Sequence, residues 1–238
     1  FGTGNFEEIF AGLQNTQPLS NALSWAAILL VITAVLKSAQ FPTHGWLVKV
    51  VETPTPVSAL LHAGLLNAGP FLMVRMSFLM SEATSASLLL IILAGFTALF
   101  ASVVFLTQPS VKVALGYSSI AHMGFSLLIC GFGVYSAALL HVVAHSFYKA
   151  HAFLSSGSVI DAVRARKVKL PKRMGSIGRV GLSIVASMAI FTFFCYLWGI
   201  QPAEDFSLMA TGAIIVMGLS QVISTTLDSK GTVQAVMQ

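Results

Sequence analysis

Several prolines, among them Pro42, Pro54 and Pro56, interrupt an otherwise apolar stretch of the sequence between residues 34 and 75. Proline lacks a backbone N–H and clashes with the preceding turn, so a membrane-spanning helix breaks or bends where it occurs. Irregular backbone at membrane depth is stable only where it is buried in protein or lines a hydrated cavity. A broken helix beside ionisable side chains is typical of an ion pathway. We therefore predict a helix break at the centre of such a pathway, formed by Gln40, Pro42, Pro54 and Pro56.

The composition places the chain among helical membrane proteins. Of the 238 residues, 56% are hydrophobic and only 9% are charged, whereas about 25% are charged in a typical soluble domain. Apolar runs of roughly 20 residues match the length of a spanning helix, and their weak alternation argues against a transmembrane barrel. Cys130 and Cys195 lie in separate runs without metal-site or disulfide spacing, so we expect both to be buried packing residues.

The predicted fold is an all-α, polytopic membrane protein with about seven spans, the first of which is discontinuous. We expect one transmembrane domain over residues 1–238, as the C-terminal part of a longer chain. Residues 1–19 are expected to form an external, periplasmic loop and residues 164–179 a basic cytoplasmic loop. The expected spans are 20–38, completed by a short helix over 43–52, then 54–80, 87–106, 110–130, 135–163, 180–200 and 206–227.

The distribution of charge sets the predicted orientation. Six of the ten residues in 164–173 are basic, and loops rich in lysine and arginine stay on the cytoplasmic side. Counting helices from that loop puts most other basic residues on the same side and the acidic turns on the opposite side. This topology accounts for the net charge of +5 without nucleic-acid binding. The basic residues left at membrane depth are Lys37, Arg75 and Lys149, of which Arg75 lies near a helix end and can extend to the interface.

Lys37 lies just before the predicted break, with Gln40, His44 and His62 near it in sequence. A charged lysine at the centre of a spanning helix costs about 2.5 to 3.5 kcal/mol on insertion scales. Such a side chain is therefore kept neutral, paired or hydrated. Two interpretations follow: Lys37 carries a proton at the break, or it forms a structural ion pair that holds helices together.

His141, His145 and Lys149 are spaced i, i+4 and i+8, so they form one polar stripe along the fifth predicted span. Three ionisable groups on one stripe of an apolar helix favour a hydrated proton path. The alternative is a metal site on the two histidines, but no carboxylate or cysteine lies nearby in sequence to complete it, so we expect no metal in this chain. His122 either joins the path or bonds to a carbonyl group. The predicted pathway comprises Lys37, His44, His62, His122, His141, His145 and Lys149.

Three sequence blocks resemble a known superfamily. They are KSAQFPTHGWL over residues 37–47 with PTPVSALLHA over 54–63, YSSIAHMG over 117–124, and HVVAHSFYKAHAFLSSGSV from residue 141. These blocks are similar to the antiporter-like, proton-translocating membrane subunits of respiratory complex I (the NuoL type) and of Mrp sodium/proton antiporters. The sequence over residues 62–69 and 148–158 is most similar to that of the DabB branch, which belongs to inorganic carbon transporters.

The resemblance implies an inverted-repeat, antiporter-like fold in the bacterial inner membrane. It also implies that Lys37 is the central lysine of the broken helix, that His62 is the bridging histidine, and that His141, His145 and Lys149 form the second half of the path. The family's glutamate partner of Lys37 lies on an earlier helix that is not in this chain.

The DabB branch further implies a large cytoplasmic, zinc-containing partner, the DabA-like subunit, which resembles β-carbonic anhydrases. This chain would then hold no cofactor of its own, would contact lipid and protons but no nucleic acid, and would be a transporter subunit, not an enzyme. Two alternatives stay open: a proton-pumping subunit of an NADH:quinone oxidoreductase or an Mrp-type antiporter, and a structural membrane anchor.

The sequence departs from the family pattern at two places. Residues 46–49 read WLVK, where complex I subunits have Trp-Leu-Pro-Asp. The family's repeat would also place a second lysine on the sixth span, but residues 180–200 carry no charge. We therefore expect the terminal half of the path either to be absent or to end at Lys149 and the partner subunit.

The charge distribution generates a prediction about topology. An Arg166→Cys variant should be labelled in intact cells only by a thiol reagent that permeates the membrane, because the basic loop 164–173 is expected to face the cytoplasm. Ready labelling by an impermeant reagent would show that the orientation is reversed.

Overall fold

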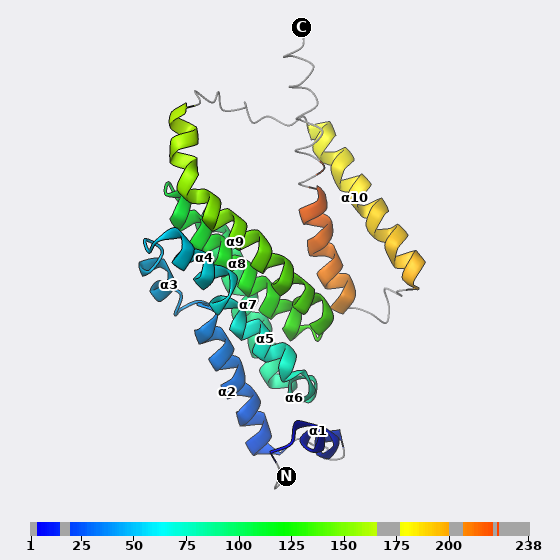
Figure 1. Ribbon diagram of the computed structural model, residues 1–238. Coiled ribbons are helices and arrows are strands. Elements are labelled where there is room, and N and C mark those ends of the chain that lie inside the picture. Colours follow the sequence, from blue (N-terminus) through cyan, green and yellow to red (C-terminus); the bar gives the residue numbers. More distant parts are fainter. Residues whose placement is uncertain (1–3, 15–19, 166–176, 200–206, 221–222, 224–238) are drawn as a thin grey trace. The chain divides into compact units, whose positions relative to one another are not determined.

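The computed structural model describes residues 4–14, 20–165, 177–199, 207–220 and 223. Every regular element in this part of the chain is a helix, which confirms the predicted all-α class. The chain divides into two compact units, Phe1–Lys167 and Val168–Gln238, which are described separately (Figure 1). The first unit holds the helices α1 (Phe6–Gln14), α2 (Asn21–Lys37), α3 (Gly45–Lys49), α4 (Thr55–Ala63), the 3₁₀ turn η1 (Leu65–Asn67), α5 (Ala68–Arg75), α6 (Ser77–Glu82), α7 (Thr84–Thr107), α8 (Val111–Gly131) and α9 (Tyr135–Ala165).

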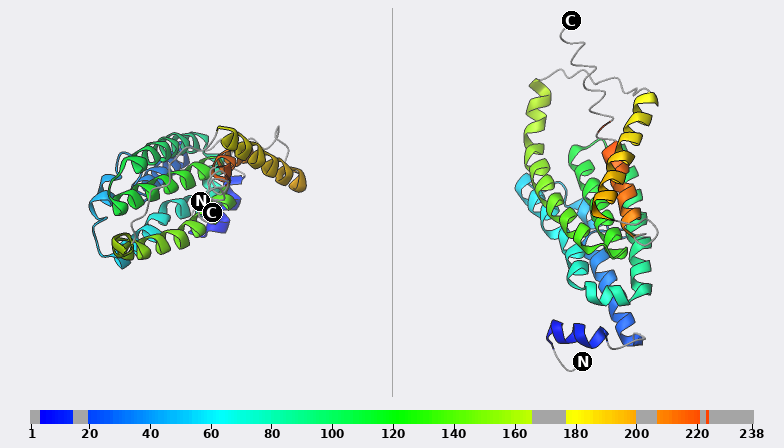
Figure 2. Two further views of the ribbon diagram at one scale, coloured as in Figure 1. Left: turned by 90° about the horizontal axis from the view of Figure 1, so that it is seen from above. Right: turned by 90° about the vertical axis from the view of Figure 1, so that its right-hand side faces the viewer.

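A short helix, α1, lies within residues 1–19, where we expected a loop. Its start is stabilised by Asn5, whose side-chain oxygen accepts a hydrogen bond from the backbone N–H of Glu7 at 3.1 Å. Glu7 and Glu8 place negative charge in the first turn, where it interacts favourably with the helix dipole. Figure 2 shows α1 set apart from the long helices, close to the start of α2.

The predicted break after the first span is confirmed. Helix α2 ends at Lys37, and the chain turns through Ala39, which has a φ of 52°. The backbone N–H of Gln40 bonds to the carbonyl of Val35 at 3.0 Å, and that of Ala39 to Leu36 at 3.4 Å. This pair of bonds is the Schellman arrangement, in which the left-handed position usually holds glycine. The short helix that follows, α3, covers only Gly45–Lys49 and not the predicted 43–52.

The second expected span, 54–80, is present as the membrane-length helical segment Thr55–Arg75, but it contains an irregular turn and ends earlier than expected. Helix α4 gives way to η1 and then to α5, and α6 follows after Met76. The local cause is Pro70, which has no N–H to donate to the carbonyl of Leu66 four residues earlier. That carbonyl accepts a hydrogen bond from Oγ of Ser38 at 2.8 Å instead.

Helices α7, α8 and α9 pack side by side and form the centre of the first unit (Figure 1). Helices α7 and α8 come into close contact at Gly124, where an added Cβ would lie 2.9 Å from the backbone N of Ala98 and 3.0 Å from the carbonyl oxygen of Ala94. The opposite face of α7 is apolar and exposed, as expected for a helix that contacts lipid. Its exposed residues include Leu88, Ile92, Phe96, Leu99, Val103 and Leu106.

Four helices of the described residues are long and apolar enough to cross a membrane, namely Thr55–Arg75, Thr84–Thr107, Val111–Gly131 and Val180–Leu197. Two shorter apolar helices cover Asn21–Lys37 and Ser207–Ser220. Helix α9 has 31 residues but is less apolar, because it carries the predicted histidine and lysine stripe. The count of about seven spans therefore stays a prediction.

The second unit contains α10 (Ile177–Trp198) and the helix over Ser207–Ser220. Most of the predicted basic loop and the end of the seventh predicted span lie outside the described residues. Cys195 in this unit and Cys130 in the first unit are both buried and free, which confirms that prediction.

The close approach of α7 and α8 generates a stability prediction. Gly124→Ala should destabilise the protein by about 1 to 3 kcal/mol, because two of the three atoms nearest to the new methyl group belong to the backbone of α7 and cannot move independently, and the third is the buried Oε1 of Gln40. Gly95→Ala is the matched control on the same helix pair, since an added Cβ there meets only a side-chain carbon of Leu128 at 3.6 Å. Thermal unfolding in one detergent compares the two variants, and equal stability would contradict the packing described here.

Candidate functional site

The predicted stripe on α9 lies against α8 in the interior of the first unit. Lys149 is fully buried, His145 is 4% exposed and His141 is partly buried. The rings of His141 and His145 are 6.2 Å apart and nearly parallel. Three ionisable side chains of one helix therefore face the protein interior, whereas Phe147 of the same helix is 76% exposed.

His122 of α8 lies beside the two histidines of α9. Its ring centroid is 5.4 Å from that of His141 and 5.4 Å from that of His145. Of the two possibilities that the sequence left open, the geometry supports the one in which His122 joins His141, His145 and Lys149. We call this group of ionisable side chains the row. The edge of Phe125, one turn further along α8, packs 5.1 Å from His141.

Lys149 reaches across to α8, where its Nζ donates a hydrogen bond to the carbonyl of Leu115 at 3.2 Å. The same carbonyl accepts a bond from Oγ of Ser119 at 3.1 Å. Nζ also lies 5.6 Å from the centre of the Tyr148 ring. A carbonyl dipole only partly offsets the cost of burying an ammonium group, which is large unless the group is paired or hydrated.

His62 of α4 continues the row from a second element. It is fully buried, and its ring stacks on Phe153 with a centroid separation of 4.2 Å and an interplanar angle of 14°. Phe153 lies one helical turn beyond Lys149 on α9, so the stack places His62 next to the lysine end of the row. On α8, Gly116 leaves room for this arrangement, because an added Cβ would lie 3.9 Å from Cε1 of His62 and 2.9 Å from Val51.

Phe153 and Gly116 are site residues that the sequence reasoning missed. The only signal for Phe153 is its spacing of i+4 from Lys149, which extends the stripe by one turn. Gly116 follows Leu115, whose carbonyl binds Lys149, but nothing in the sequence indicates which helix approaches it. The complete row consists of His62, His122, His141, His145 and Lys149.

Several buried polar atoms of the row have no hydrogen-bond partner among the described residues. They are both ring nitrogens of His62, both ring nitrogens of His145, and Nε2 of His141. Buried polar atoms in proteins are almost always satisfied, by protein groups or by ordered water. Five such nitrogens along one row therefore distinguish it from an ordinary packed interior.

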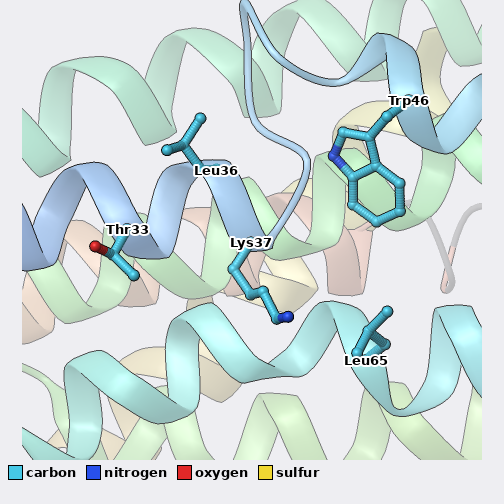
Figure 3. Close-up of a pocket in the computed structure, with 5 residues that line it drawn as sticks. All are labelled: Thr33, Leu36, Lys37, Trp46 and Leu65. Atoms are coloured by element: carbon cyan, nitrogen blue, oxygen red, sulfur yellow. The ribbon is translucent and has the colours of Figure 1, made fainter.

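Lys37 does not lie among these buried groups, although we expected it at the buried break. Its side chain is exposed in the described residues and lines an open hollow of about 450 Å³. Figure 3 shows it extending from the end of α2 toward the segment that carries Leu65. The reason for its exposure is that this part of α2 borders an apolar outer face, to which Leu29, Ile32 and Leu36 also belong. The hollow is lined by Thr33, Leu36, Lys37, Trp46 and Leu65.

Gln40 is fully buried at the break and connects it to α8. Its Nε2 donates to the carbonyl of Ser38 at 2.8 Å and to that of Ile120 at 3.4 Å. Its Oε1 is buried without a partner in the described residues and lies against Gly124. Gln40 thus lies where α2 ends, before the proline at position 42, and among the described residues its side chain makes no hydrogen bond to His44 or His62.

His44 lies outside the row. Its ring packs in an aromatic cluster, 5.9 Å from Phe41, 5.4 Å from Phe100 and 6.2 Å from Tyr117. No ring contact between His44 and His62 is found among the described residues, because His44 directly precedes α3 and its ring contacts Phe100 of α7 and Tyr117 of α8. The role of His44 in the pathway stays a prediction. Pro54 and Pro56, also assigned to the break, stand at the start of α4, where proline is tolerated because the first turn lacks helical acceptors for its N–H.

The described residues contain no group of three or more His, Cys, Asp or Glu that could hold a metal ion. The metal alternative for His141 and His145 therefore gains no support in this part of the chain. What the row offers chemically is a series of imidazole and amine groups, each able to accept or release a proton.

The family described as NADH:quinone oxidoreductase/Mrp antiporter, TM, matches residues 1–223. The chain belongs to this family. It is accordingly a multi-pass membrane protein, and the resemblance carried by the three sequence blocks is confirmed.

Among curated relatives, the chain is 41% identical over 231 residues to a protein of Halothiobacillus neapolitanus named probable inorganic carbon transporter subunit DabB2. This match covers 97% of the chain and 42% of the relative. The chain is also 44% identical over 144 residues to NADH-quinone oxidoreductase subunit L of Rhodobacter capsulatus, covering 60% of the chain and 20% of that protein.

Among solved structures, the chain is similar to one in an Mrp complex from a Dietzia species, with a TM-score of 0.60 and 29% identity. That similarity covers 85% of the chain and 24% of the solved one. The chain thus spans less than half the length of these relatives.

Proposed function

We propose that this chain is part of a proton-conducting membrane subunit. The observation that carries the proposal is the buried row of four histidines and one lysine between α4, α8 and α9. An inert membrane anchor would bear the cost of burying these groups without using them. Their unpartnered nitrogens are suited to hold a chain of water molecules, along which a proton moves between imidazole groups.

Protons suit the row better than sodium. Hard cations such as sodium favour oxygen ligands from carboxylates and carbonyls, whereas the row presents ring nitrogens and an amine. Lys149 and His62 stand at one end of the row, and His141 stands at the other. In this proposal each group holds the proton in turn, and the stack on Phe153 keeps His62 in place.

Lys37 would serve the first half of the path, at the end of α2. Its position beside an open hollow gives the amine access to water or to a further protein segment. Gln40 would contribute through its buried, unpartnered Oε1, which lies between the end of α2 and α8. His44, enclosed by aromatic rings, would act at most at the entrance to the path.

We further propose that proton flow through this subunit drives inorganic carbon uptake by a bound soluble subunit. The support is the 41% identity to a probable inorganic carbon transporter subunit over nearly the whole chain. The partner would be a large, cytoplasmic, zinc-containing protein of the carbonic-anhydrase-like DabA type, and the membrane would be the bacterial inner membrane. In this division of labour, the zinc chemistry belongs to the partner and this chain supplies the ion pathway.

The second candidate is a proton-pumping subunit of a redox complex or an Mrp-type antiporter. It is favoured by the identity of 44% to a quinone oxidoreductase subunit and by the similarity to the Mrp complex. The same row would then carry protons outward or in exchange for another cation. The partner protein distinguishes the two candidates, because the redox complex brings flavin and iron–sulfur subunits.

The buried lysine of the row generates a prediction with a matched control. Lys149→Met should abolish coupled transport while changing the free energy of unfolding by only about 1 kcal/mol, because an apolar side chain of similar size avoids the burial cost. Lys112→Met is the control, since Lys112 also donates to a backbone carbonyl, that of Thr53 at 3.1 Å, but lies outside the row. Transport by reconstituted protein and its thermal unfolding are measured together. Full transport by Lys149→Met would mean that the row is structural.

The carbon-uptake proposal is tested by growth and by co-purification. Bacterial cells that lack their own carbonic anhydrase should grow in air when they express the full-length protein with its partner, and should again need high carbon dioxide when this protein is removed. The purified complex should contain zinc in the soluble subunit. Co-purification with flavin and iron–sulfur subunits, or growth in air without this protein, would favour the redox candidate.

A further inference from the structure

The 3₁₀ turn η1 is hydrogen-bonded on both sides to segments that carry proposed proton carriers. On one side, the carbonyl of Leu66 accepts a bond from Oγ of Ser38 at 2.8 Å. On the other side, Nδ2 of Asn67 donates to Oγ of Ser146 at 2.7 Å. Ser38 directly follows Lys37, and Ser146 directly follows His145. The turn therefore stands between the end of α2 and the histidine row on α9.

The bond to Ser38 depends on two residues of α5. Pro70 cannot donate to Leu66, which leaves that carbonyl available. Gly69 allows the two segments to approach, since an added Cβ would overlap Oγ of Ser38 and would lie 2.6 Å from the carbonyl oxygen of Ala34. Ser38 is fully buried, so solvent does not compete for this bond.

The bond to Ser146 continues into α9. Oγ of Ser146 donates to the carbonyl of Val142 at 2.9 Å, within the helical turn that carries His145. Asn67 is 8% exposed and also donates to the carbonyl of Ala63 at 2.6 Å, which ties it to the end of α4. A displacement of η1 therefore changes the hydrogen bonding of α4, which bears the histidine of the Phe153 stack, and of α9.

The end of α2 is built to respond to charge. Lys37 is the last residue of the helix, where a positive charge interacts favourably with the helix dipole and a neutral amine does not. The next turn contains Ala39 in the left-handed region, a strained conformation for a residue with a Cβ. A change of charge at Lys37 therefore acts on a helix end that is already strained.

We propose that Ser38, Asn67 and Ser146 are positioning residues that link the charge state of Lys37 to the position of His145. Carbonyl and amide groups in this link carry displacement and not the proton itself. The link rests on the proposed function in one respect: Lys37 must change its charge during transport. It goes beyond that function by stating how two proton carriers on separate helices act in step.

The test is a double-mutant comparison read by nuclear magnetic resonance on the full-length protein in lipid nanodiscs, with ¹⁵N-labelled histidine. The imidazole signals of His145 are assigned with a His145→Gln variant. Lys37→Met, which mimics the uncharged state, should shift these signals in the native background. Ser38→Ala and Ser146→Ala should each remove roughly half or more of that shift, because coupling carried by a link is lost when the link is cut.

Two further variants separate the link from a general loss of stability. Ser102→Ala is the matched control, because the hydrogen bond that Oγ of Ser102 makes in the described part of the chain stays within α7, to the carbonyl of Ala98 at 2.7 Å. This variant should leave the shift unchanged. Ser38→Thr keeps the hydroxyl group and should retain the shift. If Ser38→Ala does not fold, the comparison of Ser146→Ala with Ser102→Ala decides the question.

An equal shift in the native, Ser38→Ala and Ser146→Ala backgrounds would overturn the proposed link, as would the absence of any shift in the native background. Proton flux is measured on the same preparations. If the shifts show no link but the native protein conducts protons, the proposed function still holds and only the link is wrong. If the native protein conducts no protons, the proposed function is wrong, whatever the shifts show.

Discussion

A backbone carbonyl at membrane depth needs a donor from the protein or from trapped water, because lipid offers none. In this chain the end of α2 and the turn η1 release carbonyls, and buried polar side chains bind two of them. Gln40 donates to the carbonyl of Ser38 at the end of α2, and Ser38 donates to the carbonyl of Leu66 in η1. Gln40 and Ser38, which look out of place in an apolar sequence, therefore stabilise its irregular backbone.

The same requirement explains why α8 is the centre of the site. Its glycines stand where partners come close: Gly116 beside His62, and Gly124 beside Gln40 and the backbone of α7. Its His122 lies between two histidines of α9. Because α8 has small and polar residues at these positions, it brings together ionisable groups from three elements. Burying such groups in a membrane is energetically costly, which is typical of an ion pathway.

Much of this architecture could be predicted from the sequence, because periodicity and proline positions are local signals. The long helices α7 to α9, the break before Pro42 and the stripe on α9 follow from such signals. The contacts between helices do not: neither the stack of Phe153 on His62 nor the separation of His44 from the row has a local signature. The turn at η1 has only a weak local signal, because the missing N–H of Pro70 does not indicate by itself whether a span continues past it.

Proton conduction by the buried row can be measured in liposomes that contain a pH-sensitive dye. The full-length subunit is reconstituted with its partner, and a membrane potential is imposed with potassium and valinomycin. If the row conducts protons, the potential drives protons into the liposomes at the same rate in sodium-containing and sodium-free buffers. Proton entry that requires sodium, or a constant internal pH while sodium enters, would rule out this role of the row.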